Sequence, residues 1–197
     1  FGLRELGFKA QMIGHTETGI ATVIRDYLPA RGTPEQLRRM LRHWMPADEH
    51  AAIDWDISEQ LCHPAELGWG HTVSLGKADF HGKSSLEKEP PKRKLVGLEW
   101  SSEDMATLYA AQFRDTPGAP PPDLPSGHFQ VLFLRVLEGG WASGYAYSPT
   151  LRRMISLARL DRGIPTGTKV QVAWGGINIG ATVVELPFIA RKREKAL

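Results

Sequence analysis

Hydrophobic and polar positions divide this chain of 197 residues into two regions with different spacing. Residues 1–89 mix short apolar runs with turn residues, and one segment has apolar positions at helical spacing. Residues 90–197 are rich in short runs of β-branched and aromatic residues between glycines and prolines. The charged, proline-bearing residues 89–94 lie between these patterns, which predicts a linker and a domain boundary.

One helix is predicted to begin at Pro34. Thr33 can cap its first turn, and Gln36 completes a capping box with that threonine. Apolar side chains then share one face of the helix: Leu37, Met40, Leu41 and Trp44. The arginines opposite are interpreted as a solvated face, with a phosphate clamp as the alternative, and Pro46 predicts the end of the helix.

The rest of the first region has weaker patterns. The pattern of residues 1–30 predicts strands and loops, and residues 3–8 could be the end of a helix. Residues 68–75 predict a strand and residues 83–88 a short helix. Trp55 is predicted to be an isolated anchor in a polar, turn-prone stretch.

The second region predicts a small β domain. Residues 103–114 have helical spacing, and the prolines and glycines of residues 115–127 predict a surface loop. Strands are predicted at residues 94–100, 129–137, 141–147, 154–161, 168–174 and 181–186. Antiparallel strands joined by such turns are typical of a small barrel or sandwich.

Charge and composition exclude several classes of protein. The formal net charge of +2 is too small to indicate a nucleic-acid partner or a membrane partner, so neither is expected. No apolar run approaches the roughly 20 residues that a membrane-spanning helix needs. No signal-peptide pattern opens the sequence, and the basic residues 191–195 are interpreted as a solvated tail.

Cysteine and histidine give no sign of a metal or of nucleophilic catalysis. Cys62 is the single cysteine, which excludes an intramolecular disulfide and suits a reducing, cytoplasmic location. Cys62 and the adjacent His63 would point in opposite directions on an extended chain, so a structural cysteine is predicted. The seven histidines lack zinc-type spacing, and no metal is predicted.

Four aromatic residues of the strand region have two possible roles. They could stack on a flat heterocycle or fill the core of a small barrel, and the core is the favoured interpretation. The four are Trp141, Tyr145, Tyr147 and Trp174.

Two sets of motifs carry a resemblance to a known family. The first joins residues 66–73, Glu-Leu-Gly-Trp-Gly-His-Thr-Val, to residues 77–86, Lys-Ala-Asp-Phe-His-Gly-Lys-Ser-Ser-Leu. The second is an ordered series at residues 93–98, 144–151, 155–158, 167–170 and 187–188. Together they resemble the glycine-cleavage T-protein (aminomethyltransferase) superfamily of folate-dependent one-carbon enzymes.

The resemblance implies an α+β fold and a particular division of the chain. Residues 1–89 would be the C-terminal part of a folate-binding T-protein-type domain, and residues 90–197 a small antiparallel β-barrel domain. Since the chain begins at Phe1, we expect it to be the C-terminal half of an enzyme whose N-terminal half is its partner. This half alone is expected to be inactive.

Within the superfamily, the sequence is most similar to tetrahydrofolate-dependent aryl O-demethylases of the vanillate and syringate type. The features behind this are the insert at residues 33–55 and the loop at residues 115–127. The resemblance implies tetrahydrofolate as cofactor and a small methoxy-aromatic substrate whose methyl group moves to N5 of the folate. An aminomethyltransferase and a non-catalytic folate-binding or regulatory protein are the alternatives.

The resemblance also points to a cofactor site. Family members bind the pterin ring with the glutamate of an Arg-Leu-Glu-Ala-Gly motif, which residues 15–19, His-Thr-Glu-Thr-Gly, match here. Glu17 is therefore the expected folate ligand, with a solvated loop carboxylate as the alternative. A carboxylate suits the pterin because it can accept two N–H bonds at once.

Two further positions of this cofactor site depart from the family pattern. Aryl O-demethylases carry a tyrosine where this chain has Gln11 and a tryptophan where it has Ile20. Glutamine cannot act as a phenolic acid, and isoleucine does not offer the same stacking surface. The departures indicate another methyl donor or a different proton relay, and they leave the catalytic residues unknown.

Overall fold

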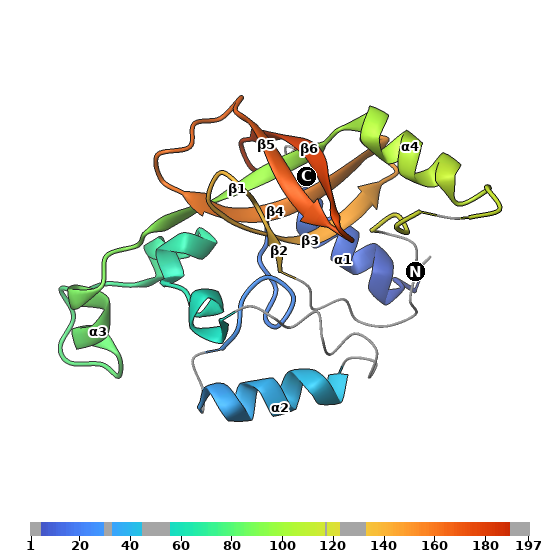
Figure 1. Cartoon of the computed structure of the whole chain (residues 1–197). Helices are drawn as coiled ribbons and strands as arrows, with labels where there is room; N and C mark the ends of the chain where they lie inside the picture. Colours follow the sequence, from blue (N-terminus) through green and yellow to red (C-terminus); the bar gives the residue numbers. More distant parts are fainter. Residues whose placement is uncertain (1–4, 30–32, 45–55, 117, 123–132, 190–197) are drawn as a thin grey trace.

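A computed structural model describes residues 5–29, 33–44, 56–116, 118–122 and 133–189 (Figure 1). The helices are α1 (Phe8–Glu17), α2 (Pro34–Trp44), α3 (Lys83–Lys88) and α4 (Ser102–Ala111), with 3-10 turns η2 (Ile57–Gln60), η3 (Pro64–Leu67) and η4 (Gly70–Thr72). The strands are β1 (Arg93–Trp100), β2 (Leu134–Arg135), β3 (Gly140–Ser148), β4 (Arg153–Asp161), β5 (Lys169–Trp174) and β6 (Ile177–Val184).

The strands form one antiparallel sheet that curls into a nearly closed barrel. Its order is β2-β3-β4-β1-β6-β5, and every neighbouring pair is antiparallel. The two edges meet, because Val136 bridges to Val172 of β5 and Leu137 N donates to Gln171 O at 3.0 Å. Closure leaves few unpaired edge groups. The predicted α+β class and antiparallel barrel are confirmed.

The central strand β4 is buried on both faces. One face, including Ala158 and Leu160, points into the barrel and packs with residues such as Leu98. The other face carries Leu157, which packs against Ala21 and Leu67 of the first region. Double burial explains why β4 reads as an almost continuous apolar run instead of an alternating one.

The first region covers the outside of the barrel. α1 lies against β3, and the apolar face of α2 contributes Leu37 and Leu41 to a cluster that also contains Phe133 and Trp141 (Figure 1). The predicted capping box forms, because Thr33 N donates to Gln36 Oε1 at 2.8 Å and Gln36 N to Thr33 Oγ1 at 3.3 Å. The proposed division at residue 89 stays a prediction.

Two predictions in the first region are wrong. Residues 1–30 contain α1, where strand and loop were expected, because α1 starts without a side-chain cap and is held by contacts far away in the sequence. Residues 68–75 form turns in place of a strand, since Gly68 has φ +76° and ends η3. Trp55, Pro46, the side chain of Trp44, residues 123–132 and the basic tail lie outside the described residues.

Candidate functional site

The candidate folate ligand Glu17 is the last residue of α1, and its side chain contacts the barrel. Ser148 Oγ donates a hydrogen bond of 2.6 Å to Glu17 Oε1. Ser148 ends β3 and is fully buried, whereas Glu17 is half-buried. Among the described residues, no hydrogen-bond donor reaches Glu17 Oε2. One carboxylate oxygen is thus held by Ser148, and the other accepts no hydrogen bond from a described residue.

The turn between β3 and β4 fixes Ser148. Leu151 N donates to Ser148 Oγ at 3.0 Å, and Arg152 N donates to Ser148 O at 2.8 Å. Arg152 has φ +55°, a left-handed conformation that closes the turn. A serine before a proline is a common turn residue whose hydroxyl bonds the turn backbone, and Ser148 does so here. Its contact with Glu17 was not expected.

Helix α1 is fastened to β3 next to Glu17. Thr16 Oγ1 donates to Gly144 O at 2.7 Å, and Arg25 Nη2 donates to the same carbonyl at 2.6 Å. Arg25 Nη2 also donates to Thr16 Oγ1 at 2.7 Å. The Gly144 carbonyl is turned toward α1 because β3 shifts register there and Gly144 has φ +58°. The bulge thereby fixes the residue that precedes Glu17.

Arg25 and its neighbour Asp26 are buried residues of opposite charge. Asp26 is 1% exposed and accepts hydrogen bonds from Thr22 N at 2.8 Å and Ser143 Oγ at 2.9 Å. Burial raises the pKa of the Asp26 carboxyl, while Arg25 lowers it by a smaller amount. Burial also lowers the pKa of Arg25, opposed by Asp26. The pair stabilises α1 on the barrel only while both groups remain in place.

Gln11 and Ile20 lie apart from the Glu17–Ser148 contact. Gln11 is exposed and stands six residues before Glu17, which is about 9 Å along the helix axis. Ile20 is 37% exposed, and its backbone N donates to His15 O at 2.8 Å just beyond the helix. That these residues bind a cofactor stays a prediction.

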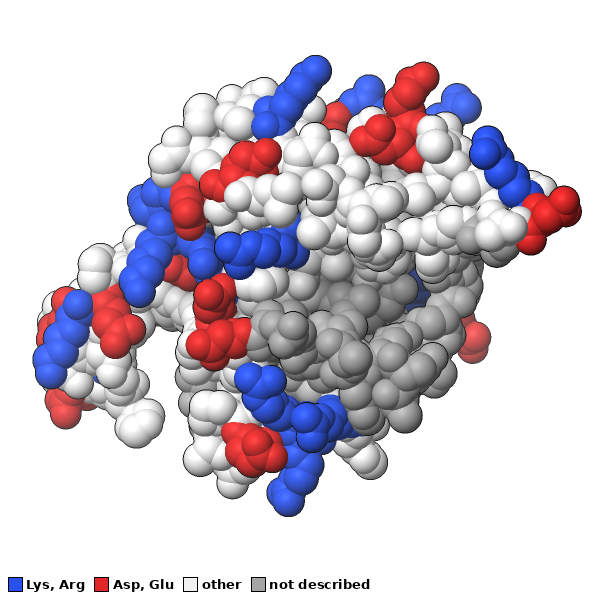
Figure 2. Space-filling model, in the orientation of Figure 1, with Lys and Arg blue, Asp and Glu red and all other residues white. Residues whose placement is uncertain are grey.

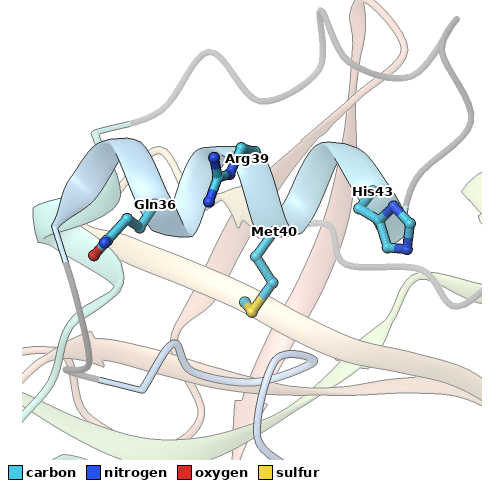
Figure 3. Close-up of a pocket in the computed structure, with 4 residues that line it drawn as sticks. All are labelled: Gln36, Arg39, Met40 and His43. Carbon is cyan, nitrogen blue, oxygen red and sulfur yellow. The ribbon is translucent and has the colours of Figure 1, made fainter.

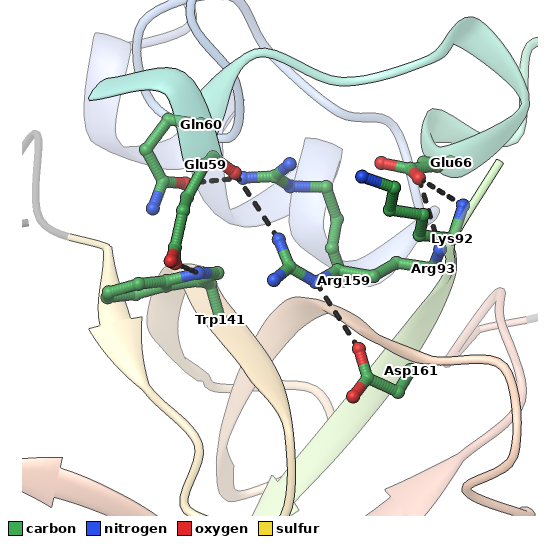
Figure 4. A network of polar contacts seen from close by, with 8 residues as sticks. All are labelled: Glu59, Gln60, Glu66, Lys92, Arg93, Trp141, Arg159 and Asp161. Atoms are coloured by element: carbon green, nitrogen blue, oxygen red, sulfur yellow. Dashed lines mark hydrogen bonds and ion pairs between the residues drawn. The ribbon is translucent and has the colours of Figure 1, made fainter. Parts of the chain in front are cut away.

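A second polar network joins η2 and η3 to the barrel (Figure 4). Glu66 Oε1 accepts from Lys92 N at 2.7 Å and from Arg93 N at 3.1 Å, so the glutamate of residues 66–73 anchors the start of β1. Arg159, 2% exposed, donates to Gln60 Oε1. These contacts give the first family motif a structural role.

Two of the remaining contacts join Glu59 of the first region to the barrel, and a third joins strands β1 and β4 (Figure 4). Glu59 Oε2 accepts from Trp141 Nε1 at 3.0 Å. Arg93 donates from Nη1 to Glu59 O at 3.3 Å and from Nε to Asp161 at 3.4 Å. The network therefore positions η2 against the barrel.

Cys62 and His63 do not form a catalytic pair. Burial raises the pKa of the Cys62 thiol to about 11, so the thiol is protonated at neutral pH. His63 Nδ1 accepts from Ala65 N at 3.0 Å and caps η3. In the described ranges, no three side chains of His, Cys, Asp or Glu come together as a metal site.

Three of the four aromatic candidates pack in apolar clusters. Tyr145 packs beside Trp100 at 6.1 Å and Trp174 at 5.9 Å between ring centroids, and Trp141 is buried at the contact with α2. Tyr147 is 44% exposed on β3. The core interpretation therefore holds for Tyr145 and Trp174, whereas Trp141 is buried outside the barrel, in the cluster that contains Leu37 and Leu41 of α2.

A depression of about 400 Å³ lies along α2 and is lined by Gln36, Arg39, Met40 and His43 (Figure 3). Figure 2 shows Lys and Arg side chains gathered at the α2 edge of this face, with mixed charges elsewhere. The arginines belong to a single helix. The solvated face and the phosphate clamp therefore both remain compatible with this geometry.

None of the helices in the described part of the chain combines the length and the apolar content needed to cross a bilayer.

Comparison with known proteins connects this geometry to a family. Residues 93–189 match the family model described as the glycine cleavage T-protein C-terminal barrel domain. An aminomethyltransferase of Thermotoga neapolitana is 32% identical over 132 residues, which covers 66% of this chain and 31% of the relative. One of Ralstonia pickettii is 33% identical over 135 residues, covering 68% of this chain and 30% of the relative.

A sesamin methylene transferase of a Sinomonas species is 25% identical over 227 aligned positions, which span 100% of this chain and 50% of that protein. The crystal structure of glycine cleavage system aminomethyltransferase T from Bartonella henselae aligns with 65% of this chain and 32% of that chain at 20% identity. Its TM-score of 0.43 is too low to support a fold assignment. The chain spans about a third to a half of the length of these curated relatives.

Proposed function

This chain belongs to the glycine cleavage T-protein superfamily, and from that membership we propose that it is the C-terminal part of a tetrahydrofolate-dependent methyltransferase. The methyl donor is a small aromatic methyl ether, and the products are a phenol and methyl-tetrahydrofolate. The proposed partner of the chain is an N-terminal half that carries the rest of the folate pocket.

The span of the similarity is the observation that supports an aryl-ether donor. The alignments with the aminomethyltransferases cover about two thirds of the chain, 66% and 68%. The alignment with the sesamin methylene transferase covers 100% of it. The first region, which contains Glu17 and the α2 insert, is therefore shared with a relative named for moving a one-carbon unit of sesamin.

The chemistry of Glu17 fits a pterin. Bound tetrahydrofolate would supply the N5 nucleophile that accepts the one-carbon group. Glu17 would bind the aminopyrimidine edge, since its free Oε2 and the second lone pair of Oε1 can accept two adjacent N–H groups. A flat ring bound at two points is fixed in orientation, which is what methyl transfer requires.

The protonation of the leaving phenolate needs a group other than residue 11. Gln11 replaces the family tyrosine and is exposed, and an amide cannot deliver a proton as a phenol does. We assign proton delivery to the proposed N-terminal half or to solvent. A methyl ether whose phenolate leaving group is a more stable anion would also need less help from an acid.

The proposal is tested by combining the chain with an N-terminal half. The chain alone should bind tetrahydrofolate weakly and show no turnover with vanillate or syringate, because most substrate contacts are expected in the other half. The restored protein should release a phenol and methyl-tetrahydrofolate, measured by liquid chromatography with mass detection. Full demethylase activity of the isolated 197-residue chain would contradict the division into halves.

The same assay separates the alternatives. Folate binding by the restored protein without any methyl-folate would favour a non-catalytic or regulatory protein. Turnover only with an aminomethyl-lipoyl carrier protein would favour an aminomethyltransferase, a reading supported by the relatives at 32% and 33% identity. Reactions without the methoxybenzoate serve as the control for methyl transfer.

A further inference from the structure

The half-buried Glu17 carboxylate is held from outside its own helix. Its partner Ser148 lies 131 residues away, and the 2.6 Å contact is in the short range typical of a hydroxyl donating to a carboxylate. Among the described residues, no lysine, arginine or histidine pairs with Glu17. The hydroxyl of Ser148 is thus the only side-chain donor to this carboxylate within the described ranges.

The direction of that hydroxyl is set before any ligand arrives. Leu151 N donates to Ser148 Oγ, so the oxygen accepts from the turn while its single hydrogen points to Glu17. Arg152 N closes the same turn on Ser148 O. Because Ser148 is fully buried at the end of β3, it has no room to adopt another rotamer at low cost.

The other end of the contact is equally fixed. Thr16, the residue before Glu17, donates to Gly144 O, and Ile189 N donates to Glu17 O at 3.2 Å. The backbone of Glu17 is therefore tied to β3 and to the segment after β6. A side chain with both its backbone and one carboxylate oxygen fixed loses little further freedom when a ligand binds.

We propose that Ser148 is a positioning residue that orients the Glu17 carboxylate toward two adjacent N–H donors of a flat heterocycle, the chemical class of the pterin edge. This inference rests on the proposed binding of folate by Glu17. Ser148 itself does not touch the ligand. It acts by holding Oε1, so that Oε2 and the remaining lone pair of Oε1 face the ligand together.

A double-mutant cycle tests the role of Ser148. Tetrahydrofolate is titrated, under reducing conditions, into the wild-type chain, Ser148→Ala, Glu17→Ala and the double variant, with binding followed by protein NMR because weak affinity is expected. Ser148→Ala should raise Kd about tenfold, in line with loss of one charge-assisted contact. The same change in the Glu17→Ala background should leave Kd unaltered, since no carboxylate remains to be oriented.

The matched control is Ser156→Ala. Ser156 is also a fully buried serine on the neighbouring strand β4, and its Oγ accepts from Trp100 Nε1 at 2.9 Å, inside the barrel. Its loss removes a buried hydrogen bond without touching Glu17. Kd for this variant should stay within twofold of wild type.

The outcomes distinguish this inference from the proposed function. If Glu17→Ala leaves Kd unchanged, folate binding by Glu17 is wrong and the inference falls with it. If Glu17→Ala weakens binding but Ser148→Ala does not, only the role of Ser148 is wrong. An equal loss from Ser148→Ala with and without Glu17 would mean that the serine acts through general folding.

A second measurement needs no ligand. Three-bond couplings along the Glu17 side chain should report one rotamer in the wild type and in Ser156→Ala, and averaged values in Ser148→Ala. An unchanged single rotamer in Ser148→Ala would overturn the positioning role even if all variants fold equally well.

Discussion

The barrel and the region before it are stabilised in different ways. The strands of the barrel enclose one core, with Leu98, Val172 and Ile179 fully buried, and their backbone ladders close on themselves. Among its described residues the first region has no comparable core, because the two apolar clusters they form both include residues of the barrel, such as Trp141 and Leu157. Buried polar side chains also attach the first region to the barrel.

The two regions therefore have different roles. A closed barrel with its own core provides a rigid surface, and the first region places Glu17 on that surface through α1. The Arg25–Asp26 pair and Gly144 are the points of attachment. Changes at these points should loosen α1 and leave the barrel folded, which would separate the two regions experimentally.

The largest effect is expected for Asp26→Ala. The change removes the acceptor of Thr22 N and Ser143 Oγ and leaves the guanidinium of Arg25, 6% exposed, without the negative charge of Asp26, which together should cost about 3–5 kcal/mol. Urea unfolding followed by tryptophan fluorescence at pH 7 measures the loss. Hydrogen exchange should show faster exchange in α1 but unchanged protection in β1 and β4, whereas uniform deprotection would contradict the two-region account.

Gly144→Ala should have the next largest effect. A Cβ at Gly144 would collide with Asp26 Oδ1 and lie 3.1 Å from Arg25 Cζ, and φ +58° disfavours any L side chain. The two penalties together amount to about 2–4 kcal/mol. Gly163→Ala is the control, since its Cβ would meet nothing within 4 Å, and it should change the unfolding free energy by less than about 0.5 kcal/mol.

Asp26 also determines a pH dependence. Burial raises the pKa of its carboxyl above the ordinary 3.8, so near that pH the folded state retains a proton that the unfolded state has lost. The free energy of unfolding contributed by Asp26 therefore falls as pH rises from 3.8 through the raised folded pKa. Asp26→Asn should abolish this decrease in the free energy of unfolding, which amounts to about 1.4 kcal/mol for each unit by which folding raises the pKa. Urea midpoints between pH 4 and pH 7 measure it.

Parallel stability curves for the wild type and Asp26→Asn over that pH range would show that the carboxyl of Asp26 titrates alike in both states. That outcome would contradict the claim that the buried carboxyl of Asp26 helps to hold the first region on the barrel.

Thr33→Ala should have the smallest effect. It removes the Thr33 side chain from the capping box of α2 and should cost about 1 kcal/mol. The loss should appear as helix fraying at Glu35 and Gln36 in NMR, with the barrel unaffected. Thr107→Ala, which removes an exposed hydroxyl bonded within α4, is the control and should leave α2 unchanged.

The fold was predictable from sequence where the pattern is local. The strands of the barrel follow apolar runs between glycine and proline turns, and Thr33 with Gln36 marks the start of α2. Helix α1 was missed because its stability comes from Thr16 contacting Gly144, 128 residues away. Nothing within residues 8–17 indicates that distant partner.

The site was predictable only in part, for the same reason. The resemblance pointed to Glu17, but its contact with Ser148 depends on the tertiary fold. Arg25 and Asp26 were overlooked. Both residues stand between Ile24 and Tyr27, but charged side chains are seldom fully buried, so the sequence carried no signal for their burial.

The most direct test of the account is to map tetrahydrofolate binding on this chain residue by residue. In ¹H–¹⁵N NMR titrations, the account predicts that the amide shifts change at the end of α1 around Glu17 and at the β3–β4 turn around Ser148, and not in α2. Shifts confined to the α2 depression at Arg39 and His43, or no shifts at millimolar ligand, would contradict it.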